Sequence, residues 1–135
     1  MRLFVDTSAF YALASQNDAF HQKAKTHLKK LITGHEFITT SYIVAETLAL
    51  LQNRGGKSAA LHFLDSLNRG KWVEILWISE KLHLEGCRLF LKNTAEVSFV
   101  DCVSFAAMHH HSIKYFFGFD EHFEKAGFIS TVSGE

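Results

Sequence analysis

Four acidic side chains in this sequence stand where they could act together. Asp6 and Asp120 each directly follow an apolar run, and Asp101 follows a third such run at the start of a predicted helix. Glu46 lies in another predicted helix among mainly apolar neighbours, which is an unfavourable place for a lone carboxylate. Since the chain has only five aspartates, the placement of three of them at the ends of apolar runs suggests one shared site.

Each acid also has a purely structural interpretation. Asp6 and Asp120 could cap the helices that follow them, and Ser98 with Asp101 has the spacing of a capping box. Glu46 could lie at the border of its helix with its carboxylate in water. Capping explains each aspartate singly, but it leaves unexplained why separate elements would bring acids to one edge of a sheet. Jointly the four acids favour a site.

A cluster of carboxylates requires a cation. The acids repel one another, which raises their proton affinity and destabilises the fold unless a divalent ion neutralises them. Oxygen ligands without His or Cys suit Mg²⁺ or Mn²⁺ better than zinc. Such a site polarises a phosphodiester and makes a bound water more acidic, so the expected chemistry is hydrolysis of a phosphate ester.

Alternating strands and helices must position these acids. The predicted strands are residues 3–5, 37–39, 73–77, 115–117 and one near Ile129. A first helix is predicted just after residue 8, and further helices are predicted at residues 19–32, 41–53, 57–67, 79–91, 101–110 and 120–126. Ser41 is the expected cap of the helix at 41–53, and Gly55-Gly56 separates that helix from the next one. In the second helix, Ala24, Leu28, Leu31 and Ile32 form the expected buried face. This order predicts an α/β fold, a three-layer α/β/α sandwich with a central, mainly parallel sheet of about four to five strands.

Length and composition set further bounds. A chain of 135 residues fits one domain, residues 1–135, and equal numbers of basic and acidic residues argue against general attraction to nucleic acid. Any contact with RNA must therefore be local. No apolar run reaches the length of a membrane span and the N-terminus does not fit a secretory signal, so we expect a cytoplasmic protein with no membrane partner.

Four stretches resemble the motifs of PIN domain ribonucleases. Residues 4–10 (FVDTSAF) resemble the opening motif, and residues 39–47 (TTSYIVAET) resemble the segment that carries the glutamate. Residues 100–106 (VDCVSFA) and 119–128 (FDEHFEKAGF) are similar to the third and closing motifs. The four motifs occur in the family's order and at its separations, so the resemblance covers nearly the whole chain and implies a PIN-like fold.

The resemblance also implies roles for individual residues. Asp6 and Asp101 would be the principal metal ligands, Asp120 would complete the cluster, and Glu46 would act directly or through a metal-bound water. The hydroxyls of Thr7 and Ser8 would hydrogen-bond a ligating carboxylate or a metal-bound water. Many relatives have Thr two residues before the last aspartate where this chain has Gly118, which leaves open whether one metal binds or two.

Small single-domain members of the family are mostly VapC-like toxins of type II toxin–antitoxin systems. The resemblance therefore implies an Mg²⁺- or Mn²⁺-dependent endoribonuclease that is often a homodimer and is inhibited by a cognate antitoxin. Arg54 and Lys57 are candidates for holding RNA phosphates, although a solvated surface explains them equally well. Apolar side chains near helix surfaces could line an interface or pack in the core; these are Tyr11, Phe20, Phe63 and Phe90.

Two other functions remain open at this point. The chain could be a PIN-domain RNA-processing nuclease that has no antitoxin. It could also be a catalytically silent α/β binding module, although a receiver-like module needs paired acids in its first loop and Asp6 has no acidic neighbour there.

Overall fold

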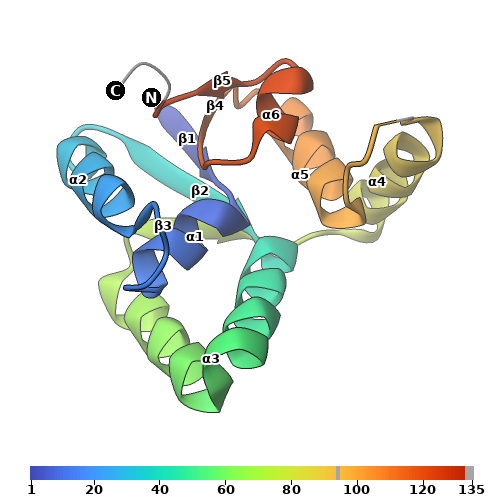
Figure 1. The fold of residues 1–135 in the computed structure, drawn as a ribbon. Coiled ribbons are helices and arrows are strands. Elements are labelled where there is room, and N and C mark those ends of the chain that lie inside the picture. Colours follow the sequence, from blue (N-terminus) through green and yellow to red (C-terminus); the bar gives the residue numbers. More distant parts are fainter. Residues whose placement is uncertain (94, 133–135) are drawn as a thin grey trace.

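Five parallel strands form the centre of the molecule in this computed structural model, which describes residues 1–93 and 95–132 (Figure 1). The strands are β1 (Arg2–Val5), β2 (Glu36–Thr40), β3 (Val73–Leu76), β4 (Tyr115–Phe117) and β5 (Ile129–Ser130), in the order β3-β2-β1-β4-β5. Every pairing is parallel. The predicted sheet of four to five mainly parallel strands is confirmed.

Six helices accompany the sheet in the described part of the chain. They are α1 (Thr7–Ala14), α2 (His21–Leu31), α3 (Ser41–Gly70), α4 (Glu80–Lys92), α5 (Phe99–His110) and α6 (Glu121–Lys125). None of the described helices is both long enough and apolar enough to cross a membrane.

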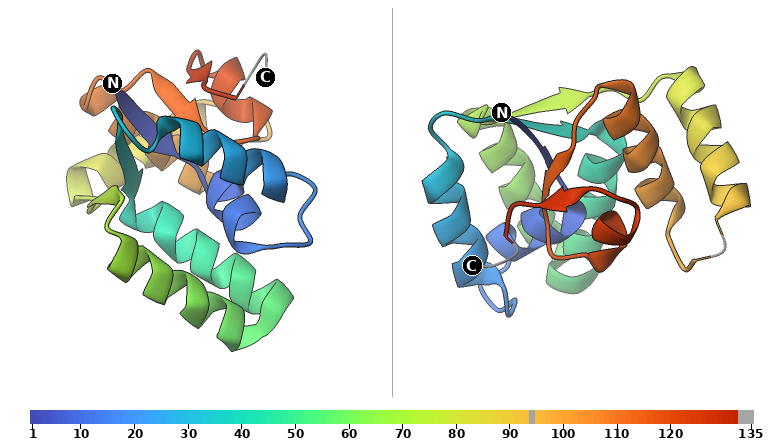
Figure 2. Two further views of the ribbon diagram at one scale, coloured as in Figure 1. Left: turned by 90° about the vertical axis from the view of Figure 1, so that its left-hand side faces the viewer. Right: turned by 90° about the horizontal axis from the view of Figure 1, so that it is seen from above.

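Side chains that alternate along the strands pack against helices on both faces of the sheet. Phe4 and Phe116 are paired in register, and both rings contact the ring of Phe123 in α6. The next residue along, Phe117, points to the other face and contacts His27 in α2. Figures 1 and 2 show α1 and α2 on one side of the strands and α5, with α4 beyond it, on the other. The three-layer arrangement is therefore confirmed.

The strand order determines where a site can form. From β1 the chain adds β2 and β3 on one side and later β4 and β5 on the other, so the direction of winding reverses between β1 and β4. In open parallel sheets ligands bind beyond the carboxyl ends of the strands at such a reversal. Asp6 follows β1 directly and Asp120 follows β4, so both acids lie at this point.

The expectation that Ser41 caps its helix is wrong by one residue. Thr40 is the cap, since its hydroxyl accepts a hydrogen bond from the backbone N–H of Ile43 at 3.1 Å. Ser41 is the first helical residue, and its hydroxyl accepts instead from the N–H of Ile78 at 3.0 Å. Thr40 and Ser41 are adjacent hydroxyl residues, and either could cap the helix. The hydroxyl of Ser41 is used instead by Ile78, which lies in the chain after β3.

Gly56 divides α3 into two helical halves, as the Gly55-Gly56 pair predicted. Its φ of 81° lies in the region that favours glycine, and the two halves fold back beside each other (Figures 1 and 2). The first half carries Glu46 and the second carries Phe63, which packs in the core against Phe10.

Three other local expectations need correction. Of the face expected for α2, Ala24 is buried and Leu28 and Leu31 pack against the core while partly buried, whereas Ile32 is 43% exposed just beyond the helix end and His27 is buried instead. His27 replaces the expected apolar contact because Thr131 provides a partner 2.9 Å from its Nε2. Strand β3 ends at Leu76, which leaves Trp77 exposed, and α5 begins at Phe99 rather than at Asp101.

Candidate active site

The side chain of Asp6 lines a cavity and does not cap a helix. Its backbone N–H donates to the carbonyl of Phe117 at 3.0 Å, which extends the pairing of β1 and β4 by one residue. Asp6 occupies the N-cap position of α1, but its side chain makes no capping hydrogen bond. The carboxylate instead accepts from the Ser8 hydroxyl at 2.8 Å, and the residue is only 2% exposed. The capping interpretation is therefore wrong for this residue.

The hydroxyls of Thr7 and Ser8 connect the acids to their surroundings. Thr7 Oγ1 donates to Glu46 Oε1 at 2.6 Å and so joins the start of α1 to α3. Ser8 Oγ, besides donating to Asp6, accepts from the backbone N–H of Phe119 at 2.8 Å. These three hydrogen bonds fix the orientation of two carboxylates and hold the chain segments after β1 and β4 together.

Asp101 and Asp120 do cap helices, and this capping places their carboxylates. Ser98 and Asp101 form the predicted capping box at the start of α5, with Asp101 N–H donating to Ser98 Oγ at 3.0 Å. Asp120 Oδ1 accepts from the backbone N–H of His122 at 2.9 Å at the start of α6. The structural and functional interpretations therefore coexist at these two positions.

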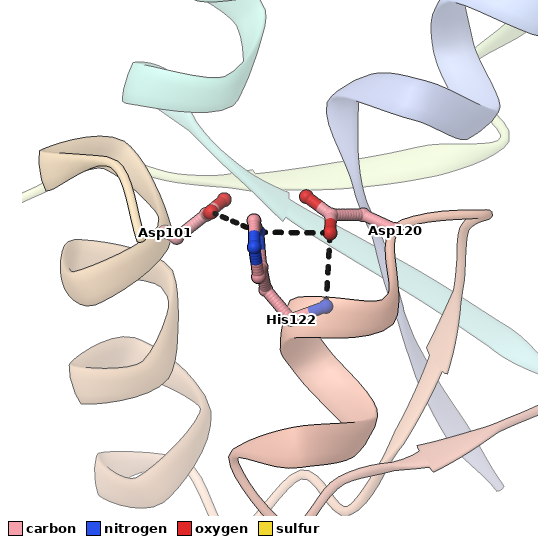
Figure 3. A group of neighbouring side chains, drawn as sticks. All are labelled: Asp101, Asp120 and His122. Atoms are coloured by element: carbon pink, nitrogen blue, oxygen red, sulfur yellow. Dashed lines mark hydrogen bonds and ion pairs between the residues drawn. The ribbon is translucent and has the colours of Figure 1, made fainter. Parts of the chain in front are cut away.

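His122 joins this group, although the sequence analysis did not select it. Its Nδ1 lies 3.0 Å from Asp120 Oδ1 and 3.7 Å from Asp101 Oδ2, and Figure 3 shows the ring between the two carboxylates. One ligand atom from each of the three residues lies within 4.8 Å of the others. The only signal was its position in the closing motif, two residues after Asp120 in the first turn of a short helix.

One cavity of about 490 Å³ collects these groups. All four predicted acids line it; its described lining residues are Asp6, Thr7, Ser8, Tyr11, Asp18, Phe20, Glu46, Leu50, Arg54, Glu96, Ser98, Asp101, Phe119, Asp120 and His122. Of the two basic residues considered for RNA binding, Arg54 lines the cavity and Lys57 does not. Asp18 and Glu96 are acids at the cavity that the sequence analysis did not single out.

Burial and mutual repulsion make two of the carboxyls weak acids. Burial raises the pKa of Asp6 from 3.8 to about 7, opposed by the Ser8 hydrogen bond and assisted by the charges of Asp101 and Asp120. The pKa of Asp101 rises to about 6, mainly through burial and the charge of Asp120. Such shifts are expected where carboxylates are held together in a poorly hydrated place.

These residues fit a divalent cation. Carboxylate oxygens from four elements line one cavity, and a cation would relieve the repulsion that raises the pKa values of Asp6 and Asp101. His122 Nδ1 is buried and has no aligned hydrogen-bond partner, although Asp120 lies close to it. A buried polar atom without a hydrogen-bond partner, such as this nitrogen, could contact an ion or a water molecule bound to the ion.

Gly118 leaves room for Asp6 and Ser8. A Cβ atom at this position would lie 3.0 Å from Asp6 Cβ, 3.2 Å from Asp6 Oδ2 and 3.2 Å from Ser8 Oγ. A side chain at this position would require Asp6 and Ser8 to shift by a few tenths of an ångström.

Comparisons with known proteins agree with this geometry. The PIN domain family model matches residues 3–129. The chain is 31% identical over 132 residues to the 23S rRNA-specific endonuclease VapC20 from two strains of Mycobacterium tuberculosis, covering 96% of this chain and 97% of that protein. The crystal structure of Mycobacterium tuberculosis VapC20, described as a Sarcin-Ricin loop cleaving toxin, matches with a TM-score of 0.86 and 30% identity over 94% of this chain and 96% of that one. VapBC2 from Rickettsia felis, bound to a promoter DNA fragment, shares the fold with a TM-score of 0.71 and 15% identity over 96% and 97% of the two chains.

The raised pKa of Asp6 predicts how substitution changes stability. Between pH 4 and pH 7 the folded protein holds a proton on Asp6 that the unfolded chain releases, so this group lowers the free energy of unfolding as pH rises. Asp6→Asn removes the effect. In EDTA at pH 7.5 we expect the variant to melt higher than the parent by about 4 °C or more, and to lose this advantage near pH 4.

Thermal melts of parent and variant across this pH range measure the effect. Other ionisable groups contribute to both proteins alike, so the difference between the two proteins is the relevant quantity. An advantage that grows toward low pH would contradict the assignment.

Gly118→Ala should disturb the site by steric pressure on Asp6 and Ser8. Overpacking of this kind costs about 1–3 kcal/mol of stability. We expect a lower melting temperature and weaker Mn²⁺ binding in calorimetric titration. Unchanged Mn²⁺ affinity in a folded variant would mean that Asp6 can shift without consequence for the site.

Proposed function

This chain belongs to the PIN domain family, as its four motifs predicted, and we propose that it is a metal-dependent endoribonuclease that acts as the toxin of a toxin–antitoxin pair. The observation that carries the proposal is the convergence of Asp6, Glu46, Asp101 and Asp120 from separate elements on one cavity. Membership of the family supports this cavity as the site of nuclease chemistry.

Similarity along nearly the whole chain supports RNA as the substrate. The Mycobacterium tuberculosis protein that is 31% identical is named an endonuclease specific for 23S rRNA, and its structure is titled as that of a toxin that cleaves the Sarcin-Ricin loop. We take RNA as the substrate class of this chain, and the Sarcin-Ricin loop as the first substrate to test.

The acids have distinct tasks in this proposal. Asp6, Asp101 and Asp120 supply oxygen ligands, and Glu46 acts directly or through a bound water. Thr7 holds Glu46 and Ser8 holds Asp6, so both carboxylates are oriented before substrate arrives. The proposed ion is Mg²⁺ or Mn²⁺, which when bound would polarise the phosphodiester, lower the pKa of a water and stabilise the leaving oxygen.

Arg54 provides a local positive charge for the RNA backbone. The guanidinium lies 5.0 Å from the ring centre of Tyr11, and both residues line the cavity. This contact keeps the charge beside the acids, where it can pair with a phosphate next to the cleaved one. Lys57 is exposed outside the cavity, so we assign it at most to more distant phosphates.

An aromatic surface borders the same cavity. Phe20 and Phe119 are stacked with ring centres 4.5 Å apart and planes 7° apart, and Phe20 is 45% exposed. Single-stranded RNA is commonly held by stacking of bases on exposed aromatic rings. We assign this pair to an unpaired base beside the cleavage point.

An antitoxin and a second copy of the chain are the proposed protein partners. The similar Mycobacterium tuberculosis protein is described as a toxin, which supports an inhibitory partner here. Large apolar side chains remain exposed on and just before α4, namely Trp77, Leu84, Phe90 and Leu91, and these support a homodimer. Phe63, also considered for an interface, is buried in the core.

Substitution of the principal ligands should abolish cleavage. With Mn²⁺ present, we expect Asp6→Asn and Asp101→Asn to cut RNA about 100-fold or more slowly than the parent, because several kcal/mol of charge stabilisation are lost. Asp65→Asn is the matched control, since Asp65 is an exposed acid on α3 that pairs with Arg69. The assay is cleavage of a Sarcin-Ricin loop oligonucleotide and of total RNA, with mapping of the ends.

The same variants induced in cells distinguish the alternatives. Growth arrest with discrete cleavages in the parent and in Asp65→Asn, but not in the two site variants, supports a toxin. Cleavage without growth arrest favours an RNA-processing nuclease. Intact RNA in every strain would favour a catalytically silent module, and equal cleavage by Asp101→Asn would refute the site.

Arg54 and Lys57 should differ in their effects on RNA binding. We expect Arg54→Ala to raise KM for a short RNA by about tenfold with a smaller change in kcat, because the lost contact is made to bound substrate. Lys57→Ala should change KM much less. Steady-state cleavage at two salt concentrations tests this, and equal effects of the two substitutions would contradict the assignment of Arg54 to the cavity wall.

A further inference from the structure

Resting on the proposed metal-dependent nuclease, we infer that His122 Nδ1 is a nitrogen ligand in the metal site and biases that site toward Mn²⁺ over Mg²⁺. The inference concerns a residue outside the four acids. It predicts a degree of preference for Mn²⁺ over Mg²⁺ that carboxylates alone would not give.

The position of the ring is the first support. Nδ1 lies 3.0 Å from Asp120 Oδ1 and 3.7 Å from Asp101 Oδ2, so the nitrogen is surrounded by the same oxygens that would bind the ion (Figure 3). One ligand atom from each of these three residues lies within 4.8 Å of the others, a span that a single ion can bridge.

The state of the nitrogen is the second support. Nδ1 is buried and no hydrogen-bond donor or acceptor is aligned with it, although the rest of the ring reaches solvent and the side chain is 31% exposed. The buried nitrogen is therefore the one that faces the carboxylates, and an imidazole nitrogen is a common metal ligand.

The backbone fixes the ring in this place. Asp120 Oδ1 accepts from the His122 N–H at 2.9 Å, so the capping of α6 brings residue 122 back over residue 120. The next residue, Phe123, is fully buried against Phe4, Phe105 and Phe116, which anchors the helix turn that carries the histidine. The ring is therefore positioned by the fold before any ion binds.

A nitrogen ligand has a chemical consequence for selectivity. Mg²⁺ strongly prefers oxygen ligands, whereas imidazole suits transition metals. In the series of divalent ions Mn²⁺ accepts both kinds of ligand. A site of three or four carboxylates with one imidazole should therefore bind Mn²⁺ preferentially, and removal of the imidazole should reduce the preference rather than abolish binding.

Pulsed electron paramagnetic resonance of the untagged protein loaded with Mn²⁺ tests the inference directly. A ligating imidazole produces a ¹⁴N coupling, which we expect in the parent and in His62→Ala, whose exposed histidine on α3 lies outside the cavity. The coupling should vanish in His122→Ala and in His122→Gln. Calorimetric titration should show Mn²⁺ affinity reduced on the order of tenfold in His122→Ala, with a much smaller change for Mg²⁺.

The outcomes separate this inference from the proposed function. If Mn²⁺ binds to the parent, Asp101→Asn abolishes that binding and no ¹⁴N coupling is seen, His122 is not a ligand and the carboxylate site stands. Equal loss of Mn²⁺ and Mg²⁺ affinity in His122→Ala would likewise assign the histidine a structural role. If the parent binds neither ion, both the inference and the metal-dependent function are wrong.

Discussion

Repulsion among buried carboxylates is the constraint on which the rest of this structure depends. Asp6 and Asp101 are nearly inaccessible to water, and burial with mutual charge raises their pKa values to about 7 and about 6. A chain that folded only to reach its most stable state would not collect these groups in one cavity. The β1–β4 pairing, the Ser8 bridge and the caps of α5 and α6 resist the repulsion. The caps are local features of the sequence, whereas the pairing and the bridge join segments that are far apart in the chain.

Helix capping holds two of the four acids that are proposed as ion ligands. Asp101 and Asp120 satisfy backbone N–H groups at helix starts, so their positions are stabilised even without a metal. Asp6 occupies a cap position but gives its carboxylate to Ser8 and to the cavity instead. Asp6, the most buried of the four acids, therefore does not cap its helix with its side chain, which supports its proposed role as an ion ligand.

The sequence predicted the fold and the four acids because both depend on local signals. Short apolar runs defined the strands, Gly55-Gly56 marked the bend of α3, and acids directly after the runs had to meet at the carboxyl edge of a parallel sheet. His122 could not be selected in this way, since its ring reaches Asp101 only through the close approach of α5 and α6. The same holds for the buried His27, whose partner Thr131 is 104 residues away.

Because of the charges around the cavity, the proposed binding of RNA depends on the bound ion. The chain has no net charge, and Asp18 and Glu96 add negative charge to a cavity that already holds four acids. A phosphate approaching this cavity meets repulsion that Arg54 alone does not cancel. Favourable contact with the backbone therefore requires bound cation, whereas stacking on Phe20 and Phe119 depends on no charge. In the proposed function such a protein would discriminate by the shape and unpaired bases of its target, because the general attraction to phosphate that would hold any RNA is missing.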